Sequence, residues 1–410
     1  MNNTDELNGE NTFDLDSGEY SYVCASTLNQ MVNYIPLVMD KFKFKDFYTV
    51  TLYKDTNFTT KVKENAKWDK NLKDTLDKNI ITFHEIKIAQ NEFLKVSETI
   101  KAFDEALKNK KVFWNLTGGQ RPFILAVLEY VKDKPEHYVA YLEGNTGQIS
   151  VKSAHEEILI PYSLPKRTKI ETALKLMGFN AQSTLSMKES NKEEQVFWLD
   201  FYEKYKNTSS NLRENLVLLN KKKHENGTNF TQSDKESFWK KIYQLCQLDI
   251  HNDNSYLRRF RLGSKNQFPF GYILEEMCFH VLYGTAVKYS LGIYSSVRTY
   301  SDEAESQLDE FDILIFTNQG TILNIECKSG IMDGDVAKST KYSTYAISGV
   351  YGKPTLITPL LESEISTPIP KYPLKKSFEA ITAAQKAGLP IWSIDNIKKE
   401  LEEIIKDNSK

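Results

Sequence analysis

The sequence predicts an α/β protein made of two α/β units with a helical connector between them. Strand-like and helix-like runs alternate in the first third and again after about residue 260, with charge-rich helical sequence in between. A chain of 410 residues is too long for one ordinary core and long enough for two domains. The predicted parts are a disordered N-terminus at 1–18, a first domain at 19–165, a helical connector at 166–260 and a second domain at 261–410.

The composition narrows the functional classes. With 40% hydrophobic and 26% charged residues the chain is typical of globular proteins, and no run approaches the roughly 20 apolar residues of a membrane span. The N-terminus lacks a signal-peptide pattern, so we expect a cytoplasmic protein that makes no contact with a membrane. The four cysteines lie far apart, which disfavours a CxxC zinc pair or a disulfide framework. A net charge of -2 argues against bulk attraction to nucleic acid, so any such contact should be local or helped by a cation.

The first unit begins with a buried strand at 20–26 and continues as strand and helix in turn to the strand KVFWNL. This alternation predicts a parallel sheet with helices on both faces, in which ligands bind at the carboxyl ends of the strands. The segment Ser26-Thr27 with Asn29 follows the first strand, and Thr117-Gly118-Gly119-Gln120-Arg121 lies between a later strand and an apolar helix. Glycines allow close backbone approach and a helix N-terminus attracts anions, so the second loop is a candidate phosphate site. A tight turn is the alternative.

The connector is expected to consist of helices joined by asparagine-rich loops, and it ends in a basic patch. Arg258 and Arg259 in that patch could hold a phosphate backbone, although a solvated helix end or an internal ion-pair cluster explains them equally well. Lys338 and Lys341, on a helical stretch of the second unit, are further candidates for substrate contacts.

The second unit carries the residues that suggest chemistry. Glu326 and Lys328 are two apart on a strand, so both side chains project from one face. A Gly-ended turn at 317–320 joins this strand to FDILIF, which would hold Asp312 beside Glu326 in a hairpin. Two such carboxylates repel unless a cation lies between them, and oxygen ligands suit Mg²⁺ or Mn²⁺. The metal would activate a water for hydrolysis, while Lys328 would orient that water or offset charge on a phosphate.

A third carboxylate lies on the helix GYILEEMCFHVL. With Leu274 as zero, Glu275 falls about 100° away at the edge of the apolar face, and Glu276 falls about 200° away toward solvent. Glu275 is therefore the predicted third ligand, which makes the metal set Glu275, Asp312 and Glu326 and the catalytic set these three with Lys328.

This acidic helix, the aspartate of the hairpin and the element Glu326-Cys327-Lys328 resemble the PD-(D/E)XK nuclease superfamily. A surface salt bridge is the alternative for an isolated E-x-K. The two polar loops of the first unit resemble the CARF domain, a Rossmann-like sensor of cyclic oligoadenylates. Over about 20–160 and 265–400 the chain resembles a CARF/PD-(D/E)XK ancillary nuclease of type III CRISPR defence.

The resemblance implies a homodimer that binds one cyclic oligoadenylate, with cyclic tetraadenylate as the first expectation and cyclic hexaadenylate as the second. It implies activated, metal-dependent cleavage of single-stranded DNA or RNA, or nicking of duplex DNA. A ligand-responsive binding protein or transcriptional regulator without catalysis is the alternative, but no helix-turn-helix is evident at 166–260. The resemblance gives a ligand-binding role to Ser26, Thr27, Asn29, Thr117, Gly118, Gly119, Gln120 and Arg121.

Overall fold

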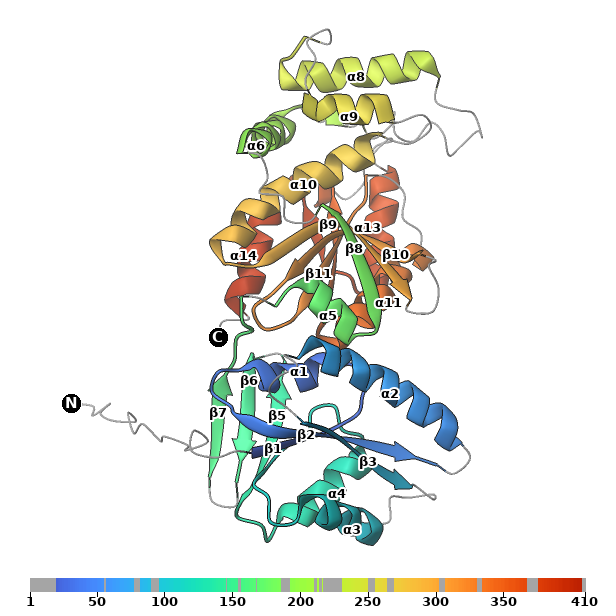
Figure 1. Cartoon of the computed structure of the whole chain (residues 1–410). Coiled ribbons are helices and arrows are strands. Elements are labelled where there is room, and N and C mark those ends of the chain that lie inside the picture. Colours follow the sequence, from blue (N-terminus) through green and yellow to red (C-terminus); the bar gives the residue numbers. More distant parts are fainter. Residues whose placement is uncertain are drawn as a thin grey trace, which may run out of the picture. The chain divides into compact units, whose positions relative to one another are not determined.

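The computed structural model describes most of the chain, and the predicted disordered N-terminus at 1–18 lies outside the described residues. The chain divides into two compact units, Met1–Thr168 with Leu176–Gly178 and Lys169–Lys175 with Phe179–Lys410 (Figure 1). The described residues are 20–54, 57–76, 82–89, 96–144, 146–153, 156–166, 168–185, 192–209, 212–213, 216, 231–249, 255–263, 269–301, 307–329, 334–366 and 375–407.

The first unit contains a seven-stranded sheet in the order β3-β2-β1-β4-β5-β6-β7. Its first five strands run parallel, as the sequence predicts, and β6 and β7 extend the sheet as antiparallel strands. The central strand β1 is buried along its whole length, which is why its sequence is apolar without alternation. The bounds are β1 Tyr20–Ala25, β2 Phe44–Tyr53, β3 Thr82–Ala89, β4 Val112–Asn115, β5 His137–Glu143, β6 Gln148–Lys152 and β7 Glu157–Pro161.

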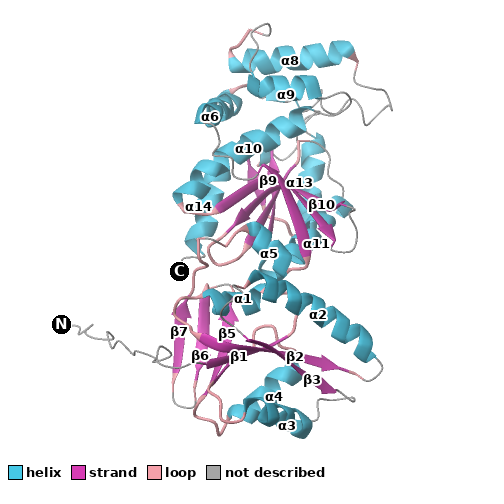
Figure 2. Cartoon of the chain, in the orientation of Figure 1, coloured by secondary structure: helices cyan, strands magenta, loops and turns pink. Residues whose placement is uncertain are grey.

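Helices cover both faces of this sheet (Figure 2). Helices α3 and α4 bury Phe103, Phe123 and Tyr130 against one face, and α1 and α2 lie on the other. Pro122 lies in the first turn of α4, where its missing N–H leaves no helical hydrogen bond unmade. The bounds are α1 Met31–Val38, α2 Phe58–Thr75, α3 Val96–Leu107 and α4 Arg121–Val131.

The second unit contains a six-stranded sheet in the order β13-β12-β11-β10-β9-β8. Helix α10 packs on β9, β10 and β11, while α11 packs on β11 and β12 and α13 on β12 and β13. The strands are β8 Phe179–Leu185, β9 Gly292–Ser301, β10 Gln307–Phe316, β11 Ile322–Cys327, β12 Lys353–Thr358 and β13 Ile391–Ser393. The helices are α5 Ile170–Leu176, α6 Lys192–Asn207, α8 Gln232–Cys246, α9 Ser255–Gly263, α10 Pro269–Lys288, α11 Gly334–Ser348, α12 Glu362–Ile365, α13 Lys375–Ala387 and α14 Ile397–Asp407.

The prediction of a helical connector at 166–260 is wrong in part. Strand β8 lies within it and pairs antiparallel with β9 as an edge strand of the second sheet. An edge strand pairs on one side only and can be short and mostly polar, as β8 is. Such a sequence lacks the apolar run that distinguishes a buried strand from the helical sequence around it. Helices α6 and α8 contribute Trp198, Tyr202 and Phe238 to the core that also contains α10, so they belong to the second unit.

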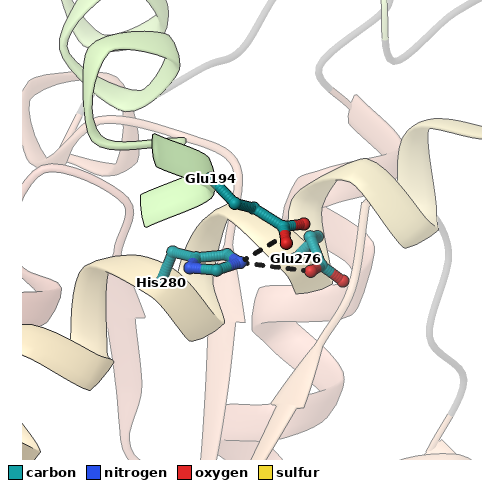
Figure 3. A group of neighbouring side chains, drawn as sticks. All are labelled: Glu194, Glu276 and His280. Carbon is teal, nitrogen blue, oxygen red and sulfur yellow. Dashed lines mark hydrogen bonds and ion pairs between the residues drawn. The ribbon is translucent and has the colours of Figure 1, made fainter. Parts of the chain in front are cut away.

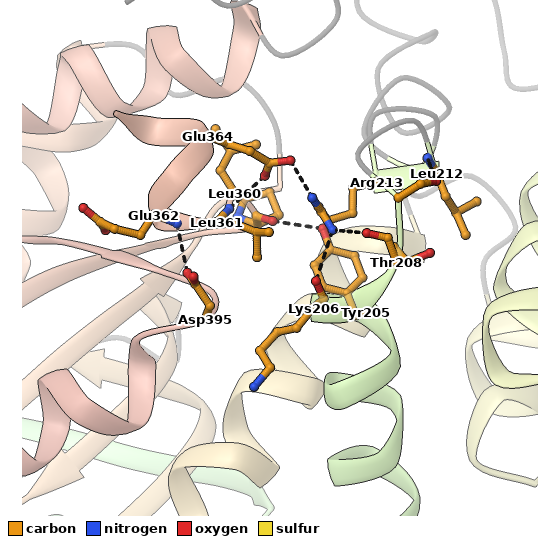
Figure 4. Close-up of polar contacts among 12 residues, drawn as sticks. Tyr205, Lys206, Thr208, Leu212, Arg213, Leu360, Leu361, Glu362, Glu364 and Asp395 are labelled. Carbon is orange, nitrogen blue, oxygen red and sulfur yellow. Dashed lines mark hydrogen bonds and ion pairs between the residues drawn. The ribbon is translucent and has the colours of Figure 1, made fainter. Parts of the chain in front are cut away.

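A buried ion pair ties this helical stretch to a distant segment of the second unit (Figure 4). Arg213 Nη2 lies 2.6 Å from Glu364 Oε1, and the two side chains are 5% and 14% exposed. Arg213 also donates to the backbone oxygens of Lys206 and Thr208. Tyr205 donates to the carbonyl of Pro359, which adds a second link between the same two segments.

The four cysteines are buried and unpaired by disulfides. In the described part of the chain, no helix combines the length and the apolar character that crossing a membrane requires.

Candidate functional site

The hairpin of β10 and β11 brings Asp312 beside Glu326. In the antiparallel register Ile313 lies opposite Ile325. Asp312 precedes Ile313 and Glu326 follows Ile325, so these two carboxylates also lie opposite each other. Gly320 closes the turn with a φ of 82°, a conformation that favours glycine. Asp312 Oδ2 accepts a hydrogen bond from the backbone N–H of Cys327 at 2.8 Å, which fixes its carboxylate at the end of β11.

Glu275, from α10, completes a group of three carboxyl groups. Burial together with the charges of Asp312 and Glu326 raises the pKa of Glu275 to about 9. Burial and the charge of Glu326 raise the pKa of Asp312 to about 7. Such shifts arise where acidic groups are drawn from water and face one another without enough positive charge.

Lys328 is the cation inside this group. Its Nζ forms an ion pair with Glu326 Oε1. Burial alone would lower the pKa of Lys328, but the surrounding Glu326, Asp312 and Glu275 raise it above its usual value, so the ammonium stays protonated at neutral pH. Cys327, between Glu326 and Lys328 in the sequence, is buried and contacts Cys278 of α10.

The chemistry of the donor set suits a hard divalent cation. Three carboxyl groups from α10, β10 and β11 offer oxygen ligands, and the single ammonium leaves an excess of negative charge once they ionise. The raised pKa values indicate that ionising all three is unfavourable without added positive charge, and a cation of two charges would supply it. The structure therefore brings together the four residues that the sequence singled out for catalysis.

The prediction that Glu276 faces solvent is wrong. Its side chain is 14% exposed and lies against Arg259 and His280. Glu194 of α6 joins them, so that Glu194, Glu276 and His280 place one ligand atom each within 4.8 Å of one another (Figure 3). A helical wheel describes α10 by itself, whereas α6 and α9 pack against the side of α10 that carries Glu276.

The four basic candidates for nucleic-acid contacts lie in different surroundings. Arg259 is ion-paired with Glu194 and Glu276, and Lys341 donates to the carbonyl of Ala387 at the end of α13. Arg258 is exposed on α9. The side chain of Lys338 is 76% exposed, and its Nζ lies 3.7 Å from Asp335 Oδ1. Their role in nucleic-acid binding stays a prediction.

In the first unit the two polar loops meet where the strand order reverses. β1 pairs with β2 on one side and with β4 on the other, all parallel, so the loops after β1 and β4 leave the same edge of the sheet. A Cβ on Gly118 would lie 2.8 Å from Thr27 Cγ2 and 3.2 Å from Val32 Cγ2. The reversal point of an open parallel sheet is where such folds bind ligands, and glycine at position 118 permits the close approach of the loops.

A chain of hydrogen bonds runs beneath these loops from Ser26 to Thr117. Ser26 Oγ and Gln30 Nε2 donate to Asp69 Oδ1 at 2.7 and 3.0 Å. Asn33 links Gln30 to Asn115, whose Oδ1 accepts from the Thr117 hydroxyl at 2.7 Å. Because the Ser26 hydroxyl donates its hydrogen bond to Asp69, its oxygen can still accept a hydrogen bond from a ligand.

Thr117 uses its hydroxyl within the protein, since the same oxygen also accepts from the backbone N–H of Leu142. Gln120 and Arg121 are exposed, and Gln120 makes no side-chain cap at the start of α4. The exposed pair can reach a ligand, whereas Thr117 holds its loop against β5. A ligand-binding role stays a prediction for all eight residues of the two loops, which are Ser26, Thr27, Asn29, Thr117, Gly118, Gly119, Gln120 and Arg121.

Residues 30–164 match the family model of the Card1 CARF domain. The N-terminal unit is a CARF domain. No curated protein matches the chain in sequence. The match covers the strands β2 to β7, the helices α1 to α4 and the loop at 117–121, while β1 lies before it. Together with the observed parallel sheet it confirms the Rossmann-like fold predicted for this unit.

Solved structures resemble the chain beyond the CARF domain. Protein VC1899 from Vibrio cholerae has 16% identity and a TM-score of 0.69, over 95% of this chain and 98% of that one. Can2 from Sulfobacillus thermosulfidooxidans, solved with cyclic tetra-adenylate, has 15% identity and a TM-score of 0.64, over 96% and 98%. A type III CRISPR defence DNA nuclease activated by cyclic oligoadenylate has 12% identity and a TM-score of 0.53, over 95% of this chain and 52% of that one. At these identities the likeness concerns the fold.

Asp69 is the residue of the CARF domain that sequence reasoning missed. It lies on α2 within lysine-rich sequence, so nothing in its neighbours marks it as buried, yet it is 2% exposed. Only its position one helical turn from buried Asn65 and Leu72 could have indicated an inward face. Burial is the main cause that raises its pKa to about 6.

We expect Asp69→Asn to make the CARF domain less sensitive to pH. Because the folded pKa of about 6 exceeds the usual 3.8, the contribution of Asp69 to stability is full below that usual value and is lost as pH rises through about 6. Asparagine keeps an acceptor for Ser26 and Gln30 without the charge. Between pH 5 and 7 the wild type should lose about 1 kcal/mol more unfolding free energy than the variant.

Pulse proteolysis of the full chain in urea at both pH values measures this difference. Asp104→Asn is the control, since Asp104 is exposed and its pKa is lowered by its hydrogen bonds from Tyr130 and Lys134. Equal pH dependence in wild type and Asp69→Asn would contradict the assignment.

Proposed function

We propose that the chain is a nuclease of antiviral type III CRISPR defence that is activated by a cyclic oligoadenylate and depends on a divalent metal. The observation that carries the nuclease half is the group of Glu275, Asp312, Glu326 and Lys328, drawn from α10, β10 and β11. The match of the N-terminal unit to the CARF domain supports activation by a cyclic oligoadenylate. We place the protein in the cytoplasm, with single-stranded DNA or RNA and duplex DNA as its substrates.

Cyclic tetraadenylate is our first choice of activator, and cyclic hexaadenylate the second. Can2, which shares the fold over almost the whole chain, was solved with cyclic tetra-adenylate. In this chain the ligand would lie over the loops after β1 and β4. Ser26 and Thr27 would meet it from one loop and Gln120 and Arg121 from the other, with Arg121 paired to a phosphate.

Hydrolysis follows from the residues of the second unit. Mg²⁺ or Mn²⁺ held by Glu275, Asp312 and Glu326 would polarise the scissile phosphodiester and lower the pKa of an attacking water. Asp312 keeps its orientation through the hydrogen bond from the N–H of Cys327. Lys328, held protonated by Glu326, offsets the charge that develops on the phosphate oxygens in the transition state.

Activation requires that the ligand favour one arrangement of the nuclease units. We propose a homodimer, because a cyclic ligand with two-fold symmetry makes equal contacts with two copies of the CARF domain. The ligand can shift the active population only by binding that arrangement more tightly than the inactive one.

Cleavage assays test the whole proposal. Labelled single-stranded DNA, single-stranded RNA and supercoiled plasmid are incubated with the full chain, with Mg²⁺ or Mn²⁺ and with each cyclic oligoadenylate. We expect cleavage only when a metal and one cyclic ligand are both present. Ligand binding without cleavage under any condition would instead favour a binding protein or regulator without catalysis.

A further inference from the structure

Helix α10 lacks the single apolar stripe that normally fixes the rotation of a helix about its axis. At about 100° per residue, its buried apolar residues face most directions around the axis; they include Ile273, Leu274, Met277, Cys278, Phe279, Val281 and Leu282. Hydrophobic burial alone then discriminates weakly between neighbouring rotations of the helix. Glu275 must nevertheless face Asp312 and Glu326, so something else has to select the rotation.

A cluster of charged groups holds a neighbouring side of the same helix turn, about 100° from Glu275. Arg259 Nη2, from α9, lies 2.6 Å from Glu276 Oε1 and 2.9 Å from Glu194 Oε1 of α6. His280 Nε2 lies 3.2 Å from the same oxygen of Glu276, and its ring is 2% exposed and stacked on Trp198. Glu276 is thereby tied to α9 through Arg259, and His280 lies 3.9 Å from Glu194 of α6, the contact that Figure 3 shows.

We propose that Arg259 is a positioning residue for Glu275. Glu275 and Glu276 are adjacent, so the rotation that keeps Glu276 on Arg259 also turns Glu275 toward Asp312 and Glu326. A rotated helix would leave these partly buried charges unpaired, which costs free energy and so disfavours that rotation. This inference rests on the proposed metal site and gives Arg259 a role that requires no contact with the metal.

The same cluster could be taken for a second metal site, since it holds a histidine and two carboxylates. The guanidinium of Arg259 lies 2.9 Å from Glu194 and 2.6 Å from Glu276, so it already occupies the space between the two carboxylates and offsets one of their two charges. The ion-pair role is therefore the one that the contacts favour.

Mn²⁺ affinity of the full chain, measured by calorimetry, tests the proposal. Arg259→Gln and Glu276→Gln should each weaken binding about tenfold, the lower end of the effect of outer residues that orient metal ligands. The exchanged variant, Arg259→Glu with Glu276→Arg, restores an attractive pair and should recover most of the affinity. Lys288→Gln, on the same helix as Glu276, is the matched control, because it breaks an exposed ion pair with Glu402 of α14.

Unfolding in urea is recorded for every variant. A loss of stability with unchanged Mn²⁺ affinity would reduce Arg259 to a structural role and overturn the proposal, as would an exchanged variant that recovers nothing. If the wild type itself binds no Mn²⁺, the metal site fails and the positioning role fails with it. Binding by the wild type and equal binding by Arg259→Gln would overturn the positioning role alone.

Discussion

Glu326→Gln and Lys328→Met should each lower the cleavage rate about a thousandfold or more. Glu326 is a proposed metal ligand and also the ion-pair partner of Lys328, so its neutralisation weakens both parts of the site. Lys328→Met removes the ammonium that offsets charge on the phosphate. Charge stabilisation of this kind contributes several kcal/mol to the transition state, and each 1.36 kcal/mol corresponds to about tenfold in rate.

The measurement is single-turnover cleavage at saturating activator, paired with calorimetry of activator binding. We expect binding to remain at the wild-type value, because the CARF domain is a separate compact unit. Glu403→Gln and Lys399→Met, which break an exposed ion pair on α14 of the same unit, are the matched controls. Wild-type rates in Lys328→Met would remove the lysine from the mechanism, and loss of activator binding would contradict the separation of the two units.

Arg213→Ala should destabilise the second unit by about 3 to 5 kcal/mol. The substitution leaves Glu364 largely buried without its partner, and it also removes the donors to the carbonyls of Lys206 and Thr208. Removing one partner of a buried ion pair has this effect because the remaining charge is uncompensated.

Urea unfolding of the full chain, followed by pulse proteolysis, measures the loss. Lys399→Ala is the control, since its exposed ion pair with Glu403 should contribute at most about 1 kcal/mol. The double variant Arg213→Met with Glu364→Leu should recover a large part of the stability, because no lone charge remains. A loss below about 1 kcal/mol in Arg213→Ala would mean that water reaches Glu364.

The sequence predicts best those features that arise from local pattern. β1, β2 and β4 are buried strands between helices, and their apolar runs identify a parallel sheet. The Glu326-x-Lys328 spacing and the turn ending at Gly320 determine which residues share a face and a register, and the structure has the predicted register. These relations depend on residues a few positions apart.

The features that the sequence misses depend on contacts between distant segments. Asp69 looks like any acidic residue of a polar helix, and only packing against Ser26 and Gln30 shows its burial. A helical wheel of α10 places Glu276 toward solvent, because it does not show that α6 and α9 pack on that side. β8 lies in helical surroundings and becomes a strand by pairing with β9.

The outer strands of the first sheet affect how two copies of the chain could associate. β7 is five residues long, begins with exposed Glu157 and ends at Pro161, which has no N–H to donate. β3, at the other edge, presents exposed Glu85 and Lys87. Such edges resist the addition of a further strand. The proposed homodimer would therefore be joined by side chains, and an interface without a shared backbone ladder can slide or loosen as a reversible signal requires.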